Sequence, residues 1–342
     1  MKIAIIGGGL AGCALAYVLR QAGQEPVVYD AGASLGSGAS GNSTGLYGPR
    51  LCALRGAQSD YYTAAYSMAL RTFKTLKDID WNPCGSLYLI HNEQKAKRYA
   101  QTVKNWGWDE GEMRLVDTVE ASEIAGVDLN YDALYLRRAG CVSPQKLCAA
   151  YMSGVDYHVN ARIESLDEVE ADVRVLACGV GALKFVEGLP IGPVRGQLTQ
   201  VKASQYSADL TCNICYGGYF TPAKDGVHTV GATFQPWLEH SEVIEQDDQD
   251  NIMKLAEVVP GLEQGLEVID RRASVRAASR DHFPVVGAVP GGLEGVYISS
   301  GHGSHGILSS LMAAHLLADM ILGRPLCLGG HSVAALSPQR FF

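Results

Sequence analysis

The chain has 342 residues, of which 47% are hydrophobic and 19% are charged, so its composition excludes disordered, collagenous and coiled-coil proteins. Its 36 acidic residues outnumber its 28 lysines and arginines, giving a net charge of −8, which removes any bulk electrostatic argument for nucleic-acid binding and leaves only a local basic patch for that role. Glycine is in excess, at 39 of 342 residues against an average of about 7%, which indicates many close backbone approaches, as around a large cofactor.

The nine cysteines lie mostly in apolar runs, and the N-terminus passes from an apolar run into a glycine loop without the cleavage site of a signal peptide. We therefore expect reduced thiols in a cytoplasmic protein. No run of about 18 uninterrupted apolar residues occurs, so we predict no membrane span and no membrane partner.

The first 30 residues predict a βαβ unit. The apolar run 2–6 indicates a strand buried on both faces of a parallel sheet. Residues 13–20 indicate a helix closed by Gly23, and 26–30 a second strand.

The rest of the chain alternates between helical and β-like patterns. Ser143 and Pro144 supply an N-cap and a first residue for one helix. We also expect a glycine-rich loop at 36–48, helices at 59–79 and 307–322, and buried strands at 172–179 and 295–300. Four turn-bounded segments predict one antiparallel sheet in a second domain, namely 84–90, 193–203, 212–221 and 226–234.

The strongest motif is a GxGxxG pattern in the correct context. Gly7, Gly9 and Gly12 follow the first strand and begin the first helix, and Asp30 ends the next strand. Free N–H groups at a helix N-terminus bind a pyrophosphate, and glycines let the backbone approach it. A carboxylate at Asp30 accepts a hydrogen bond from a ribose hydroxyl, which favours FAD or NAD over NADP.

Two further glycine-rich loops favour FAD over NAD. Gly38–Asn42 lies early in the chain, and Gly301–Gly306 precedes the long helix at 307–322, so a dinucleotide with a flavin ring has contacts at both ends. The residues we assign to the cofactor are Gly7, Gly9, Leu10, Ala11, Gly12, Asp30, Ala31, Ala39, Ser40, Gly41, Asn42, Gly45, Leu46, Ile163, Cys178, Gly179, Gly301, His302, Gly303, Ser304, His305, Gly306 and Ile307.

The predicted fold class is α/β, with a Rossmann-type FAD-binding domain and a second, antiparallel-sheet substrate domain. We expect the FAD-binding domain to comprise residues 1–80, 139–190 and 268–342. The substrate domain then comprises residues 81–138 and 191–267.

These motifs carry a family resemblance. The Gly7–Gly12 loop with Asp30, the strand end Leu176–Gly179 and the segment Gly301–Leu308 resemble the D-amino-acid oxidase superfamily, which includes glycine oxidase and sarcosine oxidase. Nearly the whole chain is similar to the FAD-dependent oxidase domain of the MnmC family, bifunctional enzymes that mature the wobble uridine of certain tRNAs. The segments that carry this similarity are 38–42, 196–197, 218–222, 276–284 and 334–340.

The resemblance to MnmC implies a D-amino-acid oxidase-like fold and an FAD-dependent removal of the carboxymethyl group from 5-carboxymethylaminomethyl-uridine in tRNA. The methyltransferase domain of MnmC has no counterpart in these residues. The family's Gly-Ser-Arg-Gly beside the flavin reads Gly-Ser-His-Gly at 303–306, and this substitution of His305 leaves the substrate open.

The resemblance to glycine oxidase implies that Arg276 holds the substrate carboxylate, because a guanidinium binds both carboxylate oxygens. We expect Arg276 to project from the end of a strand toward the flavin. Tyr219 and Tyr216 lie on an expected strand of the wall over the flavin, where a hydroxyl meets the substrate or serves sheet packing. We expect His305 to lie beside the ring and His302 to hold the flavin loop rather than to act as an acid or base.

The expected reaction is hydride transfer from a neutral secondary amine to the flavin, then imine hydrolysis, with molecular oxygen or another acceptor reoxidising the cofactor. The substrate is either a tRNA or a small molecule such as an N-substituted glycine, an amino acid or a related amine. A nucleotide-binding protein without turnover is a further alternative. The oligomeric state is not indicated.

Two weaker patterns concern cysteines. Cys212 and Cys215 have a metal-like spacing but no second ligand pair, so we expect no metal. Sarcosine oxidases tether their flavin through a cysteine, and the cysteine-free segment 273–280 implies by resemblance a non-covalent FAD.

The charged residues leave alternatives. Arg271, Arg272 and Arg280 are either surface charges or a modest basic patch for phosphates. Six acids between residues 239 and 250 would repel RNA if they faced the entrance of the site.

Overall fold

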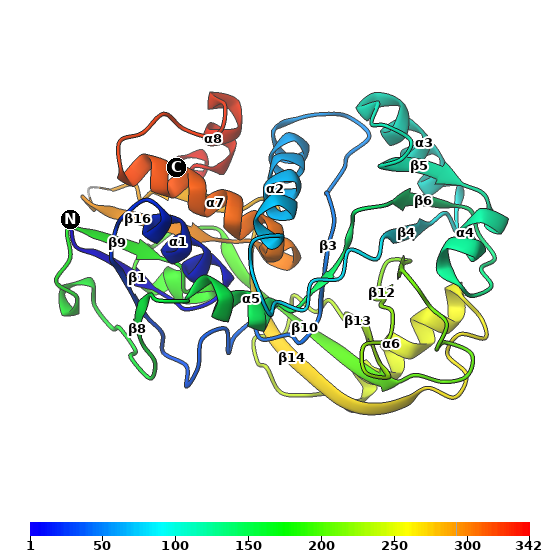
Figure 1. Cartoon of the computed structure of the whole chain (residues 1–342). Coiled ribbons are helices and arrows are strands. Elements are labelled where there is room, and N and C mark those ends of the chain that lie inside the picture. Colours follow the sequence, from blue (N-terminus) through cyan, green and yellow to red (C-terminus); the bar gives the residue numbers. More distant parts are fainter. Residues whose placement is uncertain (292) are drawn as a thin grey trace.

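The apolar run at the N-terminus forms β1 (Ile3–Ile6), which lies inside a six-stranded sheet (Figure 1). The computed structural model describes residues 1–291 and 293–342. Among the described strands of this sheet β15 alone runs antiparallel to its neighbour, so the Rossmann-type parallel core is confirmed. The order is β15 (Val285–Ala288), β16 (Val296–Ser300), β9 (Val173–Leu176), β1, β2 (Pro26–Tyr29) and β8 (Asp156–His158).

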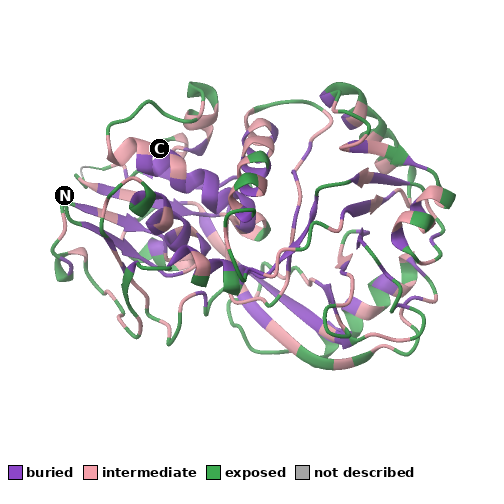
Figure 2. Cartoon of the chain, viewed as in Figure 1, coloured by how far each residue is buried: buried purple, intermediate pink, exposed green. Residues whose placement is uncertain are grey.

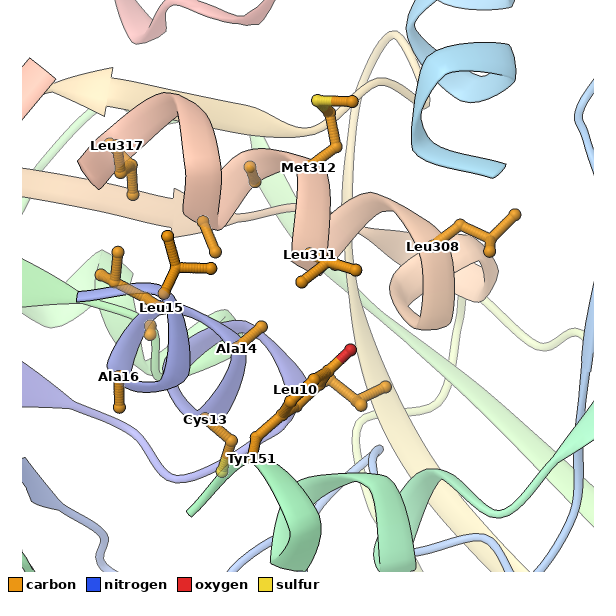
Figure 3. Close-up of a cluster of buried hydrophobic side chains, with 14 of the residues drawn as sticks. Leu10, Cys13, Ala14, Leu15, Ala16, Tyr151, Leu308, Leu311, Met312 and Leu317 are labelled. Carbon is orange, nitrogen blue, oxygen red and sulfur yellow. The ribbon is translucent and has the colours of Figure 1, made fainter. Parts of the chain in front are cut away.

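Helices α1 (Leu10–Gln21) and α7 (Gly306–Ile321) pack against each other over this sheet, and Figure 3 shows their leucines and alanines in contact. Leu15 and Leu311 are fully buried there. The long apolar runs of both helices are explained by this position, because each buries most of its surface. Figure 2 shows that buried residues follow the sheets and the helix faces against them.

Two further helices lie beside the six-stranded sheet. The expected start of the first is confirmed, and the expected end of the second is not. In α5 (Pro144–Tyr151) the Ser143 Oγ accepts a hydrogen bond from the Lys146 N–H at 3.3 Å, as an N-cap does. Helix α2 (Ala57–Phe73) ends six residues before the expected residue 79. Asp78 has a φ of 56°, so the helix could not have continued through that residue. A short helix, α8 (Gly330–Leu336), packs against α2.

The four β-like segments of the expected second domain do share one sheet, which has eight strands. The order is β14 (Glu267–Ser279), β10 (Ile191–Lys202), β13 (Val227–Gly231), β12 (Tyr219–Phe220), β11 (Asn213–Cys215), β4 (Ser86–Leu89), β6 (Ala133–Leu136) and β5 (Met113–Val116). The expectation of a purely antiparallel sheet was wrong, because β11 pairs with β4 in parallel. The long excursion between these two strands supplies the crossover that a parallel pair needs.

Helices α3 (Glu93–Trp106), α4 (Thr118–Ala125) and α6 (Glu245–Val258) accompany the eight-stranded sheet. A two-stranded antiparallel pair, β3 (Gly45–Tyr47) and β7 (Gly140–Val142), lies where the chain passes between the two sheets. None of the helices described combines the length and the apolar character that crossing a membrane requires.

Strands β10 and β14 are the longest and run together through the middle of the molecule (Figure 1). They pair from Ile191 opposite Ser279 to Lys202 opposite Glu267. The boundary expected at residue 268 therefore falls at the start of a strand that belongs to the second sheet. We accordingly propose the end of β14, after Ser279, as the last crossing between the domains.

Candidate active site

A cavity of about 1050 Å³ lies between the two sheets. One part of its wall comes from β1, the start of α1 and the start of α7, and the other from β4, β12 and β14 of the eight-stranded sheet. Of the residues considered above for cofactor and substrate, the structure brings all to this cavity except Gly12, Gly41 and Tyr216. Its size is at the upper end of the range of about 300–1,000 Å³ for small-molecule sites.

The N-terminus of α1 opens into the cavity. Gly9 is its N-cap and contributes no side-chain cap, and the Leu10 N–H donates to the Ser40 Oγ at 2.9 Å. Gly12 lies behind this turn, where a Cβ would come within 1.9 Å of the Gly7 carbonyl oxygen. The last glycine of the motif thus permits the tight turn, and the first-turn N–H groups face the cavity.

Asp30 lines the cavity directly after β2. Its carboxylate accepts hydrogen bonds from the Gly8 N–H at 2.5 Å and the Gly32 N–H at 2.7 Å. These two contacts fix the carboxylate beside the glycine loop and leave further lone pairs for a hydroxyl ligand.

The loop 36–42 is held by an arginine of the other sheet. Arg272 on β14 donates hydrogen bonds to the Ser37 carbonyl at 2.7 Å, the Gly38 carbonyl at 2.6 Å and the Asn42 Oδ1 at 3.1 Å. Gly41 lies under this guanidinium, since a Cβ there would come within 2.4 Å of Nη2. Gly41 therefore shapes the loop from behind, away from the cavity.

The third glycine loop leads through a short 3-10 helix (Gly303–His305) into α7, whose first residues line the cavity without a side-chain cap. His302 Nδ1 lies 2.8 Å from the Ser309 Oγ and Nε2 lies 3.1 Å from the Ser299 Oγ. The Ser309 hydroxyl donates to the His305 carbonyl, so His302 Nδ1–H donates to Ser309 and neutral Nε2 accepts from Ser299. Burial lowers the pKa of His302 to about 4.

His305 lies at the same turn with its ring against Tyr62, at a centroid distance of 5.2 Å. Burial, and then the positive charge of Arg50, lower the pKa of His305 to about 4. The His305 side chain is therefore neutral at physiological pH.

Arg276 lies within β14, opposite Val194 of β10, rather than at the end of a strand as expected. Its guanidinium lies over Gly196, where a Cβ would come within 2.2 Å of Nη1. It lines the cavity and, among the residues that the structure describes, has no hydrogen-bond or ion-pair partner. Burial lowers the pKa of Arg276 and neighbouring Tyr219 raises it, but an arginine stays charged.

Tyr219 on β12 also lines the cavity, and burial raises the pKa of its phenol above the ordinary value. The hydroxyl therefore stays protonated and can donate a hydrogen bond. Tyr216 does not line the cavity: it is buried, and its hydroxyl donates to the Tyr219 carbonyl at 3.5 Å. The packing alternative therefore applies to Tyr216.

Several residues that line the cavity were not predicted from the sequence. Arg50 lies two residues after the loop 36–48 and could have been found by extending that loop. Tyr88, Arg98, Tyr99 and Phe234 also line the cavity, and they come from three separate elements without a motif that connects them.

Two buried acids of the run 239–250 pair with arginines of β10 and β14. Buried Asp247 pairs with fully buried Arg195. Buried Asp248 pairs with Arg271 at 2.9 Å. Since Arg272 holds the loop 36–42, Arg280 is the one member of the expected phosphate patch without such a role among the described residues. Two of the six acids are likewise neutralised inside the protein.

Cys212 and Cys215 are buried, and burial raises the pKa of both thiols, that of Cys215 to about 12. Across the part of the chain that the structure describes, no three histidine, cysteine or acidic side chains gather in a way that could hold a metal ion.

Residues 2–320 match a protein family described as FAD dependent oxidoreductase. The chain belongs to this family. The cofactor is therefore FAD, as the glycine loops predict, and the chain is an FAD-dependent oxidoreductase.

Similar proteins refine the picture. The tRNA 5-methylaminomethyl-2-thiouridine biosynthesis bifunctional protein MnmC of Nitrosospira multiformis is 32% identical over 371 residues, and that of Shewanella amazonensis 31% over 396 residues. The alignments cover 98% and 99% of this chain and 59% of each relative. The chain thus spans somewhat more than half the length of these relatives, and the expected resemblance is confirmed.

Solved structures share the fold of this chain. Glycine oxidase from Geobacillus kaustophilus superposes with a TM-score of 0.85 at 22% identity, covering 99% of this chain and 98% of its own. Iminodiacetate oxidase from Chelativorans superposes with a TM-score of 0.80 at 20% identity, covering 98% and 99%. The D-amino-acid oxidase-like fold is therefore confirmed.

The residues present fit FAD. The cavity meets two helix N-termini without side-chain caps, which suit a pyrophosphate and an electron-rich ring. Asp30 retains acceptor capacity for a ribose hydroxyl, and Arg276, which has no partner among the described residues, lies at the other part of the cavity. FAD and a carboxylate substrate can thus be held in one continuous space.

Proposed function

We propose that the protein removes the carboxymethyl group from the secondary amine of 5-carboxymethylaminomethyl-uridine in tRNA. The observation that carries the proposal is Arg276, a partly buried guanidinium that lines the cavity without a partner among the described residues. Removing a cation from water, even in part, is costly unless a ligand supplies the opposite charge. The N–CH2–COO⁻ group of the modified uridine supplies it.

Arg276 orients this group by binding both carboxylate oxygens, and the protonated Tyr219 hydroxyl donates to the carboxylate or the amine beside it. FAD, when bound, supplies the two-electron oxidation that converts the N–CH2 bond to an imine. Water then adds to the imine carbon, and the C–N bond breaks to give the primary amine and glyoxylate. Neutral His302 and His305 keep positive charge away from the amine, which must be neutral to be oxidised.

We further propose that the FAD is bound non-covalently. Cys178 is the cysteine among the described cavity residues, and burial raises its pKa to about 11, so the thiol stays protonated and unreactive. We propose molecular oxygen as the electron acceptor.

An N-substituted glycine is the second candidate substrate, because the contact with Arg276 recognises only the carboxylate. The deciding experiment is anaerobic reduction of the yellow holoenzyme by two substrates in parallel: tRNA carrying the modified uridine, and a panel of N-alkyl glycines. Fast bleaching by the tRNA with release of glyoxylate supports the proposal. Bleaching by the glycines alone would replace it with the second candidate.

A further inference from the structure

Three basic side chains, Lys95, Arg98 and Lys254, form what we call the rim cluster at the edge of the cavity. Lys254 on α6 donates a hydrogen bond to the Gly217 carbonyl at 2.8 Å. Gly217 and Arg98 both line the cavity. Lys95 and Arg98 are three residues apart on α3 and therefore share a face of that helix.

The three charges are close enough to repel one another. Burial, together with the positive charges of Arg98 and Lys254, lowers the pKa of Lys95. The Lys95 Nζ lies 2.7 Å from the His91 Nε2, and this histidine nitrogen lies 3.0 Å from the Tyr216 carbonyl. Lys254 on α6 is thus anchored at the Gly217 carbonyl, and Lys95 on α3 contacts a histidine that lies beside the preceding residue, Tyr216.

No carboxylate neutralises the rim cluster: within the described chain none of its members forms an ion pair. By contrast, Lys97 on the same helix has Glu93 at 4.0 Å. The acids that line the cavity are Asp30 and Glu164, and both come from segments that accompany the six-stranded sheet. In a protein with a net charge of −8, an unneutralised cluster at the mouth of the site is complementary to an anionic ligand.

The surroundings favour an extended anion with planar groups. Arg98 and Lys254 are exposed, and Arg98 also lines the cavity, so the charges lie where the cavity meets solvent. Tyr88 and Tyr99 line the cavity beside Arg98, with their ring centroids 6.4 Å apart. Cations that follow a backbone, next to aromatic side chains that receive bases, are the combination by which proteins hold single-stranded RNA.

We propose that the rim cluster is a phosphate-binding subsite that holds the backbone of an RNA substrate beside the nucleotide whose carboxylate Arg276 binds. This inference rests on the proposed function and adds the residues by which RNA is told apart from a free amine. It replaces the expected patch at 271–280, where Arg271 and Arg272 are already engaged.

The test measures binding of an anticodon stem–loop RNA, labelled with fluorescein and carrying 5-carboxymethylaminomethyl-uridine, to the holoenzyme at several salt concentrations. Arg98→Ala and Lys254→Ala are compared with Lys97→Ala, which removes the same charge from α3 outside the rim. Each rim variant should bind more weakly and lose about 0.7 from the slope of log K against log salt, the value for one phosphate contact with a single strand. The Lys97→Ala variant should match the wild type.

Rim variants that bind the RNA as Lys97→Ala does would overturn the proposal. A second arm measures kcat/KM for the RNA relative to that for iminodiacetate, and this ratio should fall in the rim variants. If the rim variants instead lose activity toward iminodiacetate and keep their affinity for RNA, the rim cluster binds the second carboxylate of a small substrate, and the RNA subsite is disproved. A holoenzyme that binds RNA through the rim but does not oxidise it supports the subsite and overturns the proposed function.

Discussion

Arg276 is the residue on which the proposed chemistry most depends, since its guanidinium faces the cavity without a protein partner among the described residues. Replacing it with alanine leaves a buried carboxylate unpaired, at a cost of roughly 2–5 kcal/mol, or about thirty- to several-thousand-fold in the rate of anaerobic flavin reduction. Arg276→Lys keeps the charge but loses the paired hydrogen bonds, so its rate of flavin reduction should lie between that of the wild type and that of Arg276→Ala.

FAD content and reoxidation by oxygen should change little in Arg276→Ala, since the side chain acts on the substrate. Stopped-flow spectrophotometry measures both half-reactions. An alanine variant that is reduced at nearly the wild-type rate by the same carboxylated amine would show that the carboxylate is bound elsewhere.

Gly196 positions the guanidinium by leaving room for it. A Cβ at Gly196 would come within 2.2 Å of the Arg276 Nη1, whereas a Cβ at Gly192 on the same strand meets nothing within 4 Å. Gly196→Ala should therefore displace Arg276 and lower kcat/KM for the carboxylated amine by up to about 100-fold, as a shift near 1 Å does in other sites. Gly192→Ala is the matched control, and equal kinetics for the two variants would contradict the prediction.

At the level of elements, the turn into α7 makes stability depend on pH. The folded pKa of His302 is about 4, below the ordinary value of about 6.5. The unfolded chain therefore takes up a proton that the folded chain excludes. The contribution of His302 to the free energy of unfolding is constant above about pH 7 and falls between about pH 6.5 and 4, by about 3 kcal/mol at most.

Urea unfolding of the holoenzyme across this pH range measures the effect. His302→Gln should flatten the decline, because glutamine takes up no proton, while the same change at the exposed His240 should leave it as in the wild type. If the free energy of unfolding falls with pH equally in His302→Gln and in the wild type, the prediction is refuted.

The loop 36–42 and β14 are coupled through Arg272, which donates three hydrogen bonds to the loop. A hydrogen bond from a charged group contributes about 1.5–3 kcal/mol, so Arg272→Ala should weaken FAD binding by about tenfold or more. Fluorescence titration of the apoprotein with FAD measures this. Arg280→Ala removes an exposed arginine from the same region and should bind FAD as the wild type does; an unchanged Kd in Arg272→Ala would disprove the coupling.

The sequence predicted those elements in which local pattern and tertiary position agree. The βαβ start is one, because the glycines, the buried strand and Asp30 all occur within 30 residues. It could not predict the parallel pairing of β4 with β11, since strand direction depends on distant segments. Nor could it predict that Asp247 and Asp248 are buried, because their partners lie on β10 and β14, where no local pattern points to α6.

At the scale of the whole molecule, the cavity proposed for FAD is lined from both sheets, and its one cysteine among the described residues has a raised pKa, which predicts release of FAD on denaturation. Acid precipitation should leave the yellow colour in the supernatant, since the thiol of Cys178 is protonated and residues 273–280 have no cysteine. Spectrophotometry of pellet and supernatant measures the outcome. Flavin retained in the washed pellet would establish a covalent bond.

Strand β14 also fixes the distance between two arginines of the site. Arg272, which holds the cofactor loop, and Arg276, which faces the substrate, are four residues apart on a stretch that pairs regularly with β10. At about 3.3 Å per residue the strand separates their backbones by about 13 Å, and their equal parity places both side chains on one face. The strand therefore fixes the distance between the cofactor loop and the proposed substrate position. One residue inserted between these arginines would turn one of the two side chains to the opposite face. Evolution can therefore change the residues at either end of the site more readily than the number of residues between them.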